Sequence, residues 1–237
     1  MIYLKKLPKI SFFILIFILS FFSVSPSLTS FASEEKVIYL TFDDGPSKGP
    51  CNEVLDVLKS ENVLGTFFIL GNEIKGNEDA LKRIYSEGHS IGLHSMTHER
   101  NNLYNNDSDF LKEMLQVQET IEKVTGYKST ILRFPFGCNN NTYKLKKSLV
   151  NLLHENNFKI YDWTQDSKDG EYYNSSPEVF FKASISKDSN IVLLMHCGTI
   201  NKNSPKALGD IIKYYKNQNY VFKTISNDTP EVFHYIK

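Results

Sequence analysis

Short apolar runs alternate along the chain with segments of helical periodicity. Each run holds mainly Val, Ile, Leu, Phe and Tyr and ends at polar or turn-forming residues. Runs of this length and composition are typical of buried β-strands. The pattern predicts seven strands, at Lys36–Phe42, Leu64–Leu70, His89–His94, Thr130–Phe134, Phe158–Trp163, Ile191–His196 and Tyr220–Ile225.

Between these runs, apolar residues recur at intervals of three and four. In the longest such segment, Phe110 is followed by Met114, Val117 and Ile121. This spacing places apolar side chains on one face of an α-helix. The pattern predicts six helices, at Glu53–Ser60, Ala80–Glu87, Phe110–Val124, Lys144–Asn156, Ser176–Ser186 and Ala207–Lys216.

Strands that alternate with helices indicate an α/β protein with a parallel sheet and right-handed crossovers. Seven strands fit a closed or nearly closed (β/α) barrel better than a short open sheet. The chain has 237 residues, of which 41% are hydrophobic, enough for one sizeable core. We therefore expect a single folded domain, with no linker and no internal repeat.

The first 32 residues have the pattern of an export signal. Lys5, Lys6 and Lys9 precede an apolar stretch at residues 10–24, and Ser30 and Ala32 are small residues at the positions that a signal peptidase reads. We predict a signal peptide at 1–32, cleaved after Ala32, and a folded domain at 33–237. The alternative is an uncleaved membrane tether through residues 10–24, although this stretch is short for a span of about 20 residues.

Charge excludes one class of partner. The whole chain has a formal net charge of zero, and the part after Ala32 carries 24 basic and 27 acidic groups. A nucleic-acid-binding domain would need a clustered basic face, so we expect no nucleic acid partner.

Reactive side chains fall where the predicted strands end. The carboxyl ends of parallel strands share one face of an α/β fold, and active sites form there. Residues far apart in sequence should therefore meet at one mouth. They are Asp43 and Asp44, His94, Arg133, Asp162 and His196.

Two of these groups suggest a metal site. Adjacent carboxylates at Asp43 and Asp44 repel each other unless a cation lies between them; the alternative is a solvated turn. His94 and His98 are four residues apart, so on a helical turn or in a tight loop they can bind one metal ion. With Asp44 they would form a face of two histidines and one carboxylate with positions open to water and substrate.

Four motifs in this order resemble those of the polysaccharide deacetylase family, also called carbohydrate esterase family 4 or the chitooligosaccharide deacetylase homology domain, and especially its peptidoglycan N-deacetylases. The motifs are TFDDGP at Thr41–Pro46, HSMTH at His94–His98, RFPFG at Arg133–Gly137 and LLMH at Leu193–His196. The resemblance runs from about Val37 to Ile225. It implies an irregular seven-stranded (β/α) barrel whose catalytic face lies at the carboxyl ends of the strands.

The resemblance also implies roles for the motif residues. Asp44, His94 and His98 would hold one divalent metal ion, with zinc expected and cobalt or another ion as alternatives. Asp43 would be the catalytic base that accepts a proton from the attacking water. His196 would be the general acid that protonates the departing amine.

Four further roles come from the same resemblance. Arg133 would pair with the base, and Asp169 would orient His196. The backbone N–H of Phe136 would stabilise the oxyanion, and Pro135 and Trp163 would contact the substrate. Alternatives remain from the residues alone. Arg133 could be a structural ion-pair partner, His196 a core histidine, and Asp162 or Asp166 could replace Asp169.

The three cysteines, Cys51, Cys138 and Cys197, are an odd number for an exported protein. Cys138 and Cys197 each follow a catalytic motif and should lie near the mouth. One hypothesis is a disulfide between them that leaves Cys51 unpaired; the other is that both are small buried apolar side chains.

We therefore expect a metal-dependent hydrolase that removes N-acetyl groups from a glycan, preferably cell-wall peptidoglycan at N-acetylglucosamine or N-acetylmuramic acid. The alternatives are a chitooligosaccharide deacetylase, an O-acetyl xylan esterase, or a non-catalytic glycan-binding protein of the same fold. The protein should be a monomer that is secreted or associated with the cell wall or membrane, outside the cytoplasm.

Overall fold

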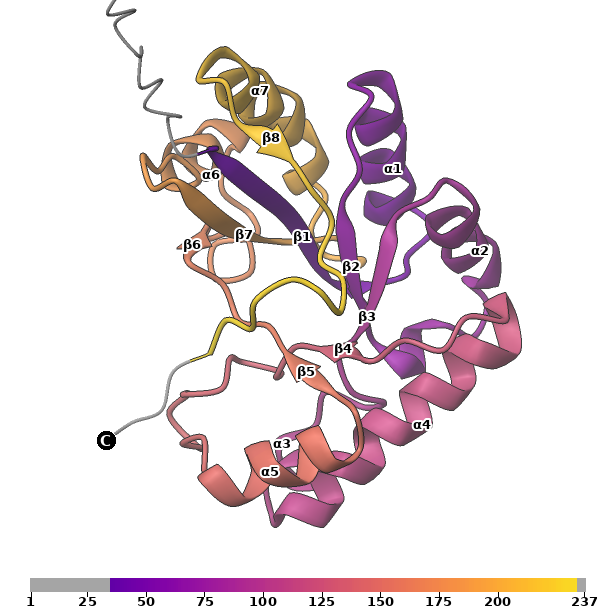
Figure 1. Ribbon diagram of the computed structural model, residues 1–237. Helices are drawn as coiled ribbons and strands as arrows, with labels where there is room; N and C mark the ends of the chain where they lie inside the picture. Colours follow the sequence, from indigo (N-terminus) through magenta and orange to yellow (C-terminus); the bar gives the residue numbers. More distant parts are fainter. Residues whose placement is uncertain (1–34, 234–237) are drawn as a thin grey trace, which may run out of the picture. The chain divides into compact units, whose positions relative to one another are not determined.

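The computed structural model describes residues 35–233, which form one α/β unit built on a parallel sheet (Figure 1). The predicted signal segment lies outside the described residues. The strands are β1 (Val37–Gly45), β2 (Thr66–Ile69), β3 (Ser90–Leu93), β4 (Ile131–Leu132), β5 (Lys159–Ile160), β6 (Gln165–Asp166), β7 (Asn190–His196) and β8 (Val221–Phe222).

Seven of these strands form one curled path in the order β5-β4-β3-β2-β1-β7-β6, a half-barrel in which every pair is parallel. The strand β8 also pairs with β1. Since β7 runs along one edge of β1 from Val37 to Asp43, β8 and β2 share its other edge. This confirms the predicted (β/α) barrel architecture.

The strand β1 lies inside the sheet, paired with β2, β7 and β8, and its side chains are buried or half-buried on both faces. Ile38, Leu40 and Phe42 are fully buried, and Tyr39 is half-buried. Burial on both faces is characteristic of a parallel sheet covered by helices. The carboxyl end of β1 therefore lies in the interior, next to the ends of β2 and β7.

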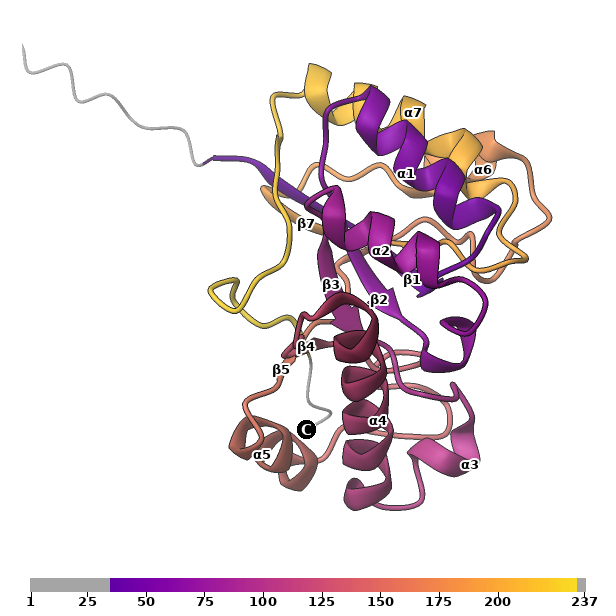
Figure 2. The same cartoon turned by 90° about the vertical axis from the view of Figure 1, so that its right-hand side faces the viewer.

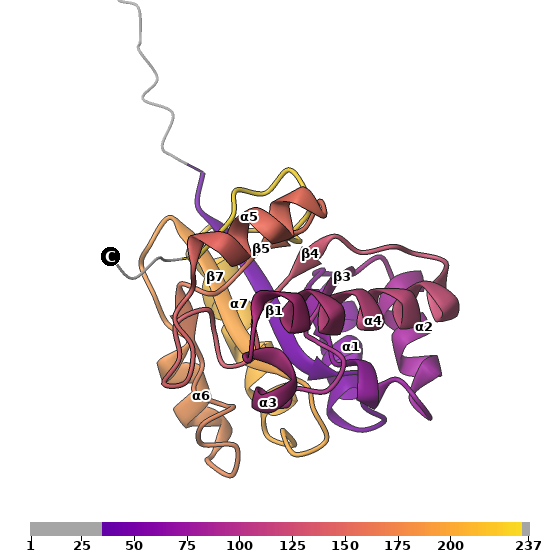
Figure 3. The same cartoon turned by 90° about the horizontal axis from the view of Figure 1, so that it is seen from below.

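The helices cover the sheet as their periodicity predicts. Figure 2 shows α1, α2 and α4 beside the sheet, and from below β1 and β7 run between α6 and α4 (Figure 3). None of the described helices is both long enough and apolar enough to cross a membrane. The helices are α1 (Pro50–Ser60), α2 (Glu78–Ser86), α3 (Arg100–Leu103), α4 (Asp107–Thr125), α5 (Lys147–Glu155), α6 (Pro177–Ala183) and α7 (Ser204–Asn217), with a 3₁₀ turn η1 (Gly71–Glu73).

Local signals set the ends of the longest helix. The Asn106 side chain accepts a hydrogen bond from the Asp109 N–H at 2.9 Å, which caps the start of α4. Gly126 has a φ of 75° and ends the helix in the left-handed conformation that glycine favours. Both ends of α4 are thus set by residues adjacent to the helix in the sequence.

We expect Gly92→Ala to destabilise the domain by about 1–3 kcal/mol, because a Cβ on Gly92 in β3 would lie 2.3 Å from Cδ1 of Phe68. Urea denaturation followed by circular dichroism measures the change. Gly209→Ala in α7 is the matched control, since a Cβ there meets nothing within 4 Å and alanine favours a helix. Equal midpoints for the two variants would contradict the close packing of β3 on β2.

Candidate active site

The end of β1 brings two adjacent carboxylates to the same mouth. Side chains alternate between faces along a regular strand, so Asp43 and Asp44 would otherwise diverge. The register between β1 and β2 shifts between Asp43 and Gly45, and Asp44 has a φ of 67°. This irregularity turns both carboxylates into one pocket.

The segment that carries His94 and His98 is a tight loop and not a helical turn. Ser95 and His98 have φ values of 72° and 60°, and the Ser95 hydroxyl accepts the His98 N–H at 2.9 Å. The rings of His94 and His98 come to lie 5.1 Å apart between centroids. The loop thus turns two histidines toward one point.

A hydrogen bond fixes the tautomer of His94. Its Nδ1 lies 3.1 Å from the backbone oxygen of Arg133, and because a carbonyl oxygen only accepts, Nδ1 carries the proton. Burial, with repulsion from His98, lowers the pKa of His94 to about 3. The ring is therefore neutral, and its Nε2 has a lone pair to offer to a metal.

Asp44 completes a set of three ligand atoms. Its Oδ1 lies 3.5 Å from His94 Nε2 and 3.6 Å from His98 Nε2, and the three groups offer ligand atoms within 4.8 Å of one another. Within the described residues, this buried oxygen has no hydrogen-bond partner, which is costly unless a cation satisfies it. The donor set fits a divalent ion with nitrogen and oxygen ligands.

Arg133 is fully buried behind Asp43. Its Nη1 donates to Asp43 Oδ1 at 2.9 Å and to the Thr41 hydroxyl at 2.7 Å. The remaining guanidinium nitrogens donate to the backbone oxygens of Tyr161 and Asp162, at 2.9 and 3.0 Å. Burial raises the pKa of the Asp43 carboxyl, while Arg133 and His196 act in the opposite direction. The carboxylate is thus held in place but remains poised to take a proton.

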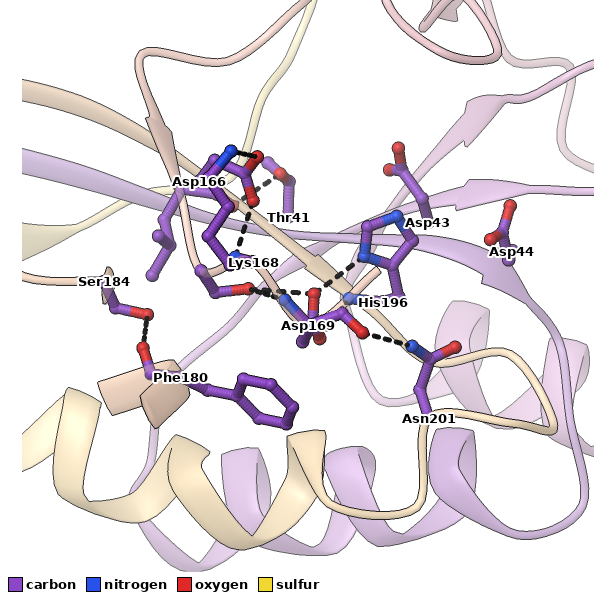
Figure 4. Close-up of polar contacts among 12 residues, drawn as sticks. Thr41, Asp43, Asp44, Asp166, Lys168, Asp169, Phe180, Ser184, His196 and Asn201 are labelled. Carbon is purple, nitrogen blue, oxygen red and sulfur yellow. Dashed lines mark hydrogen bonds and ion pairs between the residues drawn. The ribbon is translucent and has the colours of Figure 1, made fainter. Parts of the chain in front are cut away.

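His196, which is partly buried, and Asp169, which is fully buried, form a pair beside Asp43 (Figure 4). The Nδ1 of His196 donates to Asp169 Oδ1 at 2.7 Å, and its backbone N–H donates to Oδ2 at 2.9 Å. Burial alone would lower the pKa of His196, but the charge and hydrogen bond of Asp169, with help from Asp44 and Asp43, raise it to about 9. The imidazole is therefore protonated at neutral pH.

The two competing aspartates lie elsewhere. Asp162 accepts the Cys138 N–H, at 3.3 and 3.1 Å to its two oxygens. Asp166 pairs with Lys168 at 3.1 Å. Of the three carboxylates left open by the sequence, only Asp169 reaches the His196 ring within the described contacts.

Gly170 lets the loop that carries Asp169 approach the His196 ring closely. A Cβ on Gly170 would lie 2.4 Å from Cε1 of His196, so only glycine lets the backbone pass beside the ring. The absence of a side chain on Gly170 thus makes room for the imidazole.

The pocket has a volume of about 310 Å³, enough for one sugar ring. The paired aspartates, the three histidines and Trp163 line it, with Phe136 and Ile200 at its exposed rim. Phe136 has a φ of 65°. Pro135 lies behind the pocket, where its carbonyl accepts the Tyr104 hydroxyl at 2.5 Å. Of the expected substrate contacts, Phe136 and Trp163 border the pocket and Pro135 does not.

Of the two hypotheses for Cys138 and Cys197, the disulfide is wrong, since no disulfide joins cysteines in the described chain, and both side chains are buried as the alternative expects. Cys197 lies beside Gly45, where a Cβ would be 2.7 Å from its Sγ and 3.7 Å from the Sγ of Cys51. Cys138 lies on the Asp162 side of the site, bonded through its N–H. Although Cys138 and Cys197 each come directly after a motif in the sequence, their sulfur atoms are not bonded to each other.

Glu113 of α4 supports the candidate site, and the sequence reasoning missed it. Its Oε2 accepts the N–H groups of Met96 and Thr97 at 3.0 and 2.8 Å and the Thr97 hydroxyl at 3.0 Å. These bonds hold the loop between His94 and His98. Glu113 falls on the buried face of α4 beside Met114, and an acidic residue on a buried face was the signal that could have found it.

Comparison with known proteins agrees with this geometry. The polysaccharide deacetylase family model matches residues 32–156. The peptidoglycan-N-acetylglucosamine deacetylase of Bacillus cereus is 36% identical over 203 residues, which are 83% of this chain and 71% of the relative. The peptidoglycan-N-acetylmuramic acid deacetylase PdaA of Bacillus subtilis is 34% identical over 200 residues, which are 82% and 72% of the two chains.

A solved structure shows the same fold. The crystal structure of the polysaccharide deacetylase Bc1974 from Bacillus cereus superposes with a TM-score of 0.75 at 33% identity, covering 83% of this chain and 95% of that one. The chain therefore belongs to the polysaccharide deacetylase family, whose members are metal-dependent hydrolases. The resemblance read from the motifs is confirmed.

We expect Glu113→Ala to weaken binding of a divalent metal about 10–100-fold, because the loop between the two histidines loses three hydrogen bonds. Isothermal titration calorimetry with Zn²⁺ or Co²⁺ measures the affinity. Glu113→Gln keeps an acceptor oxygen and should lose less. Glu119→Ala, an exposed change on the same helix, is the control, and equal affinities for both alanine variants would contradict this role.

We expect Asp169→Asn to lower the pKa of His196 from about 9 toward or below its ordinary value of about 6.5. While Asp169 is ionised, the raised pKa of His196 contributes stability that is complete below about pH 6.5 and is lost as pH rises through about 9. The variant should therefore lose stability at pH 6 more than at pH 10. NMR titration of the imidazole tests the shift, with Asp166→Asn as the control; an unchanged value would refute it.

Proposed function

We propose that this protein is an exported, metal-dependent N-deacetylase of cell-wall peptidoglycan. The observation that carries the proposal is the convergence in one pocket of a three-ligand cluster, a buried carboxylate outside the cluster and a protonated imidazole. Hydrolysis of an amide needs an activated water, stabilisation of the oxyanion and protonation of the leaving nitrogen. The pocket offers groups for all three.

Asp44, His94 and His98 would hold the metal ion. When bound, a divalent ion supplies Lewis-acid polarisation of a carbonyl and lowers the pKa of water to near neutrality. Nitrogen and oxygen donors favour zinc, with cobalt as a substitute. The neutral His94 ring, fixed by the Arg133 carbonyl, needs no deprotonation to serve as a ligand.

Asp43 would be the base. Its Oδ1 is tied to Arg133, and its Oδ2 lies 3.7 Å from His94 Nε2, at the edge of the ligand cluster. An oxygen in that place can accept a proton from the attacking water. Arg133 would aim the carboxylate and partly offset the rise that burial causes in its pKa.

His196 would be the acid. Its Nδ1 is engaged by Asp169, so Nε2 is the nitrogen that gives a proton to the departing amine. The Phe136 N–H would donate to the substrate oxygen, and the positive φ of this residue orients its peptide at the rim. Trp163 and Phe136 would hold the sugar ring through apolar contact.

Peptidoglycan is the preferred substrate because several similar proteins carry this activity in their names, on N-acetylglucosamine in one case and on N-acetylmuramic acid in another. Export follows from the pattern of residues 1–32 and suits a wall substrate. A non-catalytic glycan-binding protein would not need a protonated His196 braced by a buried carboxylate.

We expect Asp43→Asn to reduce acetate release from peptidoglycan about 10²–10⁴-fold, because the base is lost, while metal stoichiometry is unchanged. Acetate assay and metal analysis measure the two properties, and mass spectrometry of glycan fragments identifies the sugar. Asp79→Asn, an exposed carboxylate on α2, is the control.

Wild-type acetate release by Asp43→Asn would refute the assignment of the base. Activity that survives a chelator would refute the role of the metal. Absence of acetate release from any glycan by the wild-type protein, with the metal bound, would favour the glycan-binding alternative.

A further inference from the structure

Arg100 is the one arginine in this chain without an acidic partner among the described residues. The chain has three arginines. Arg83 pairs with Asp56 and Glu87 at 2.8 and 2.7 Å, and Arg133 pairs with Asp43 at 2.9 Å. Arg100 donates from Nη1 to the neutral oxygens of Asn140 and Thr142, at 3.1 and 2.7 Å. Its positive charge is therefore not neutralised.

The guanidinium group of Arg100 is held against Phe136, a residue that lines the pocket. Its Cζ lies 3.8 Å from the centroid of the Phe136 ring, a cation–π contact that fixes the plane of the group. The same ring lies 4.5 Å from the ring of His98, and both Phe136 and His98 line the pocket. The Phe136 ring therefore lies between the Arg100 guanidinium and the ring of His98, one of the proposed metal ligands.

Charge is distributed unevenly around the pocket. At another part of its wall, Asp166 and Glu171 share Lys168, at 3.1 and 3.6 Å. That part carries an excess of negative charge, whereas the Phe136 rim carries the unpaired cation. An anionic group on a bound sugar is therefore attracted to one side and repelled from the other.

We propose that Arg100 binds a carboxylate carried by muramic acid in the bound glycan and so makes the enzyme prefer muramyl-containing glycan to neutral glycan. The inference rests on the proposed deacetylase function. In muramic acid, the ring carbon adjacent to the one that bears the N-acetyl group carries a lactyl ether, and the lactyl group ends in a carboxylate. Chitooligosaccharides bear no carboxylate. A planar guanidinium matches a carboxylate with two parallel hydrogen bonds.

Sequence similarity alone does not tell which of the two sugars is preferred, since the chain is 36% identical to a deacetylase of N-acetylglucosamine and 34% identical to one of N-acetylmuramic acid. The carboxylate could be that of the free lactyl group or that of an attached peptide, in which case the lactyl group is an amide. Both offer the same chemistry to Arg100.

The test compares wild type with Arg100→Gln on three forms of N-acetylglucosaminyl-N-acetylmuramic acid. They are the free acid, its methyl ester and the form with a dipeptide on the lactyl group. We expect kcat/KM of the wild type to be about tenfold higher on the acid than on the ester. Arg100→Gln should abolish this difference mainly through KM and leave the ester within about twofold of wild type.

Two further variants control the comparison. Arg100→Lys keeps the charge but not the planar fork, and should retain part of the preference. Lys123→Gln removes an exposed charge on α4 and should leave kcat/KM unchanged on both the acid and the ester. A preference for the dipeptide form over the acid assigns the carboxylate to the peptide, and the reverse assigns it to the lactyl group.

An equal loss on acid and ester in Arg100→Gln would overturn the proposal, because Arg100 would then only support Phe136. Unchanged kinetics would overturn it as well. Calorimetric binding of the acid and the ester to both proteins tests Arg100 without turnover: tighter binding of the acid, lost in Arg100→Gln, supports the proposal even if the wild type released no acetate and the proposed function failed.

Discussion

The buried guanidinium of Arg133 is the interaction on which the site depends. Its side chain binds Asp43 and Thr41 of β1 and the backbone of Tyr161 and Asp162 beyond β5. Its own carbonyl oxygen accepts the Nδ1–H of His94. One residue thus aims the carboxylate, fixes a ligand tautomer and ties together strands from both halves of the sheet. Removing the Arg133 side chain would leave the buried Asp43 carboxylate without its ion-pair partner and would lower the free energy of unfolding by about 3–5 kcal/mol.

The parallel sheet supplies the rest of the arrangement. Because its strands run in one direction, their carboxyl ends deliver Asp43, His94, Arg133 and His196 to one mouth. Asp43 is the register partner of His196 across β1 and β7. Asp43 and His196, the proposed base and acid, therefore lie on adjacent strands, whereas His98 and Asp169 lie in two separate loops.

The charged side chains of the pocket have different partners. Asp43 is matched by Arg133, and His196 is matched by Asp169. The buried Oδ1 of Asp44, in contrast, has no hydrogen-bond partner among residues 35–233. The proposed base, acid and metal ligand thus have different surroundings, although all three line one pocket.

The sequence by itself determined the strand and helix order, the family and the residues that gather at the mouth, because buried strands and motif spacing leave local patterns. It could not reveal β6, whose two polar residues Gln165 and Asp166 form no apolar run. Only the tertiary structure distinguished Asp169 from Asp162, placed Cys197 beside Cys51 and brought Glu113 under the histidine loop. These outcomes depend on contacts between segments far apart in the chain, and no local pattern records which of several similar side chains will meet.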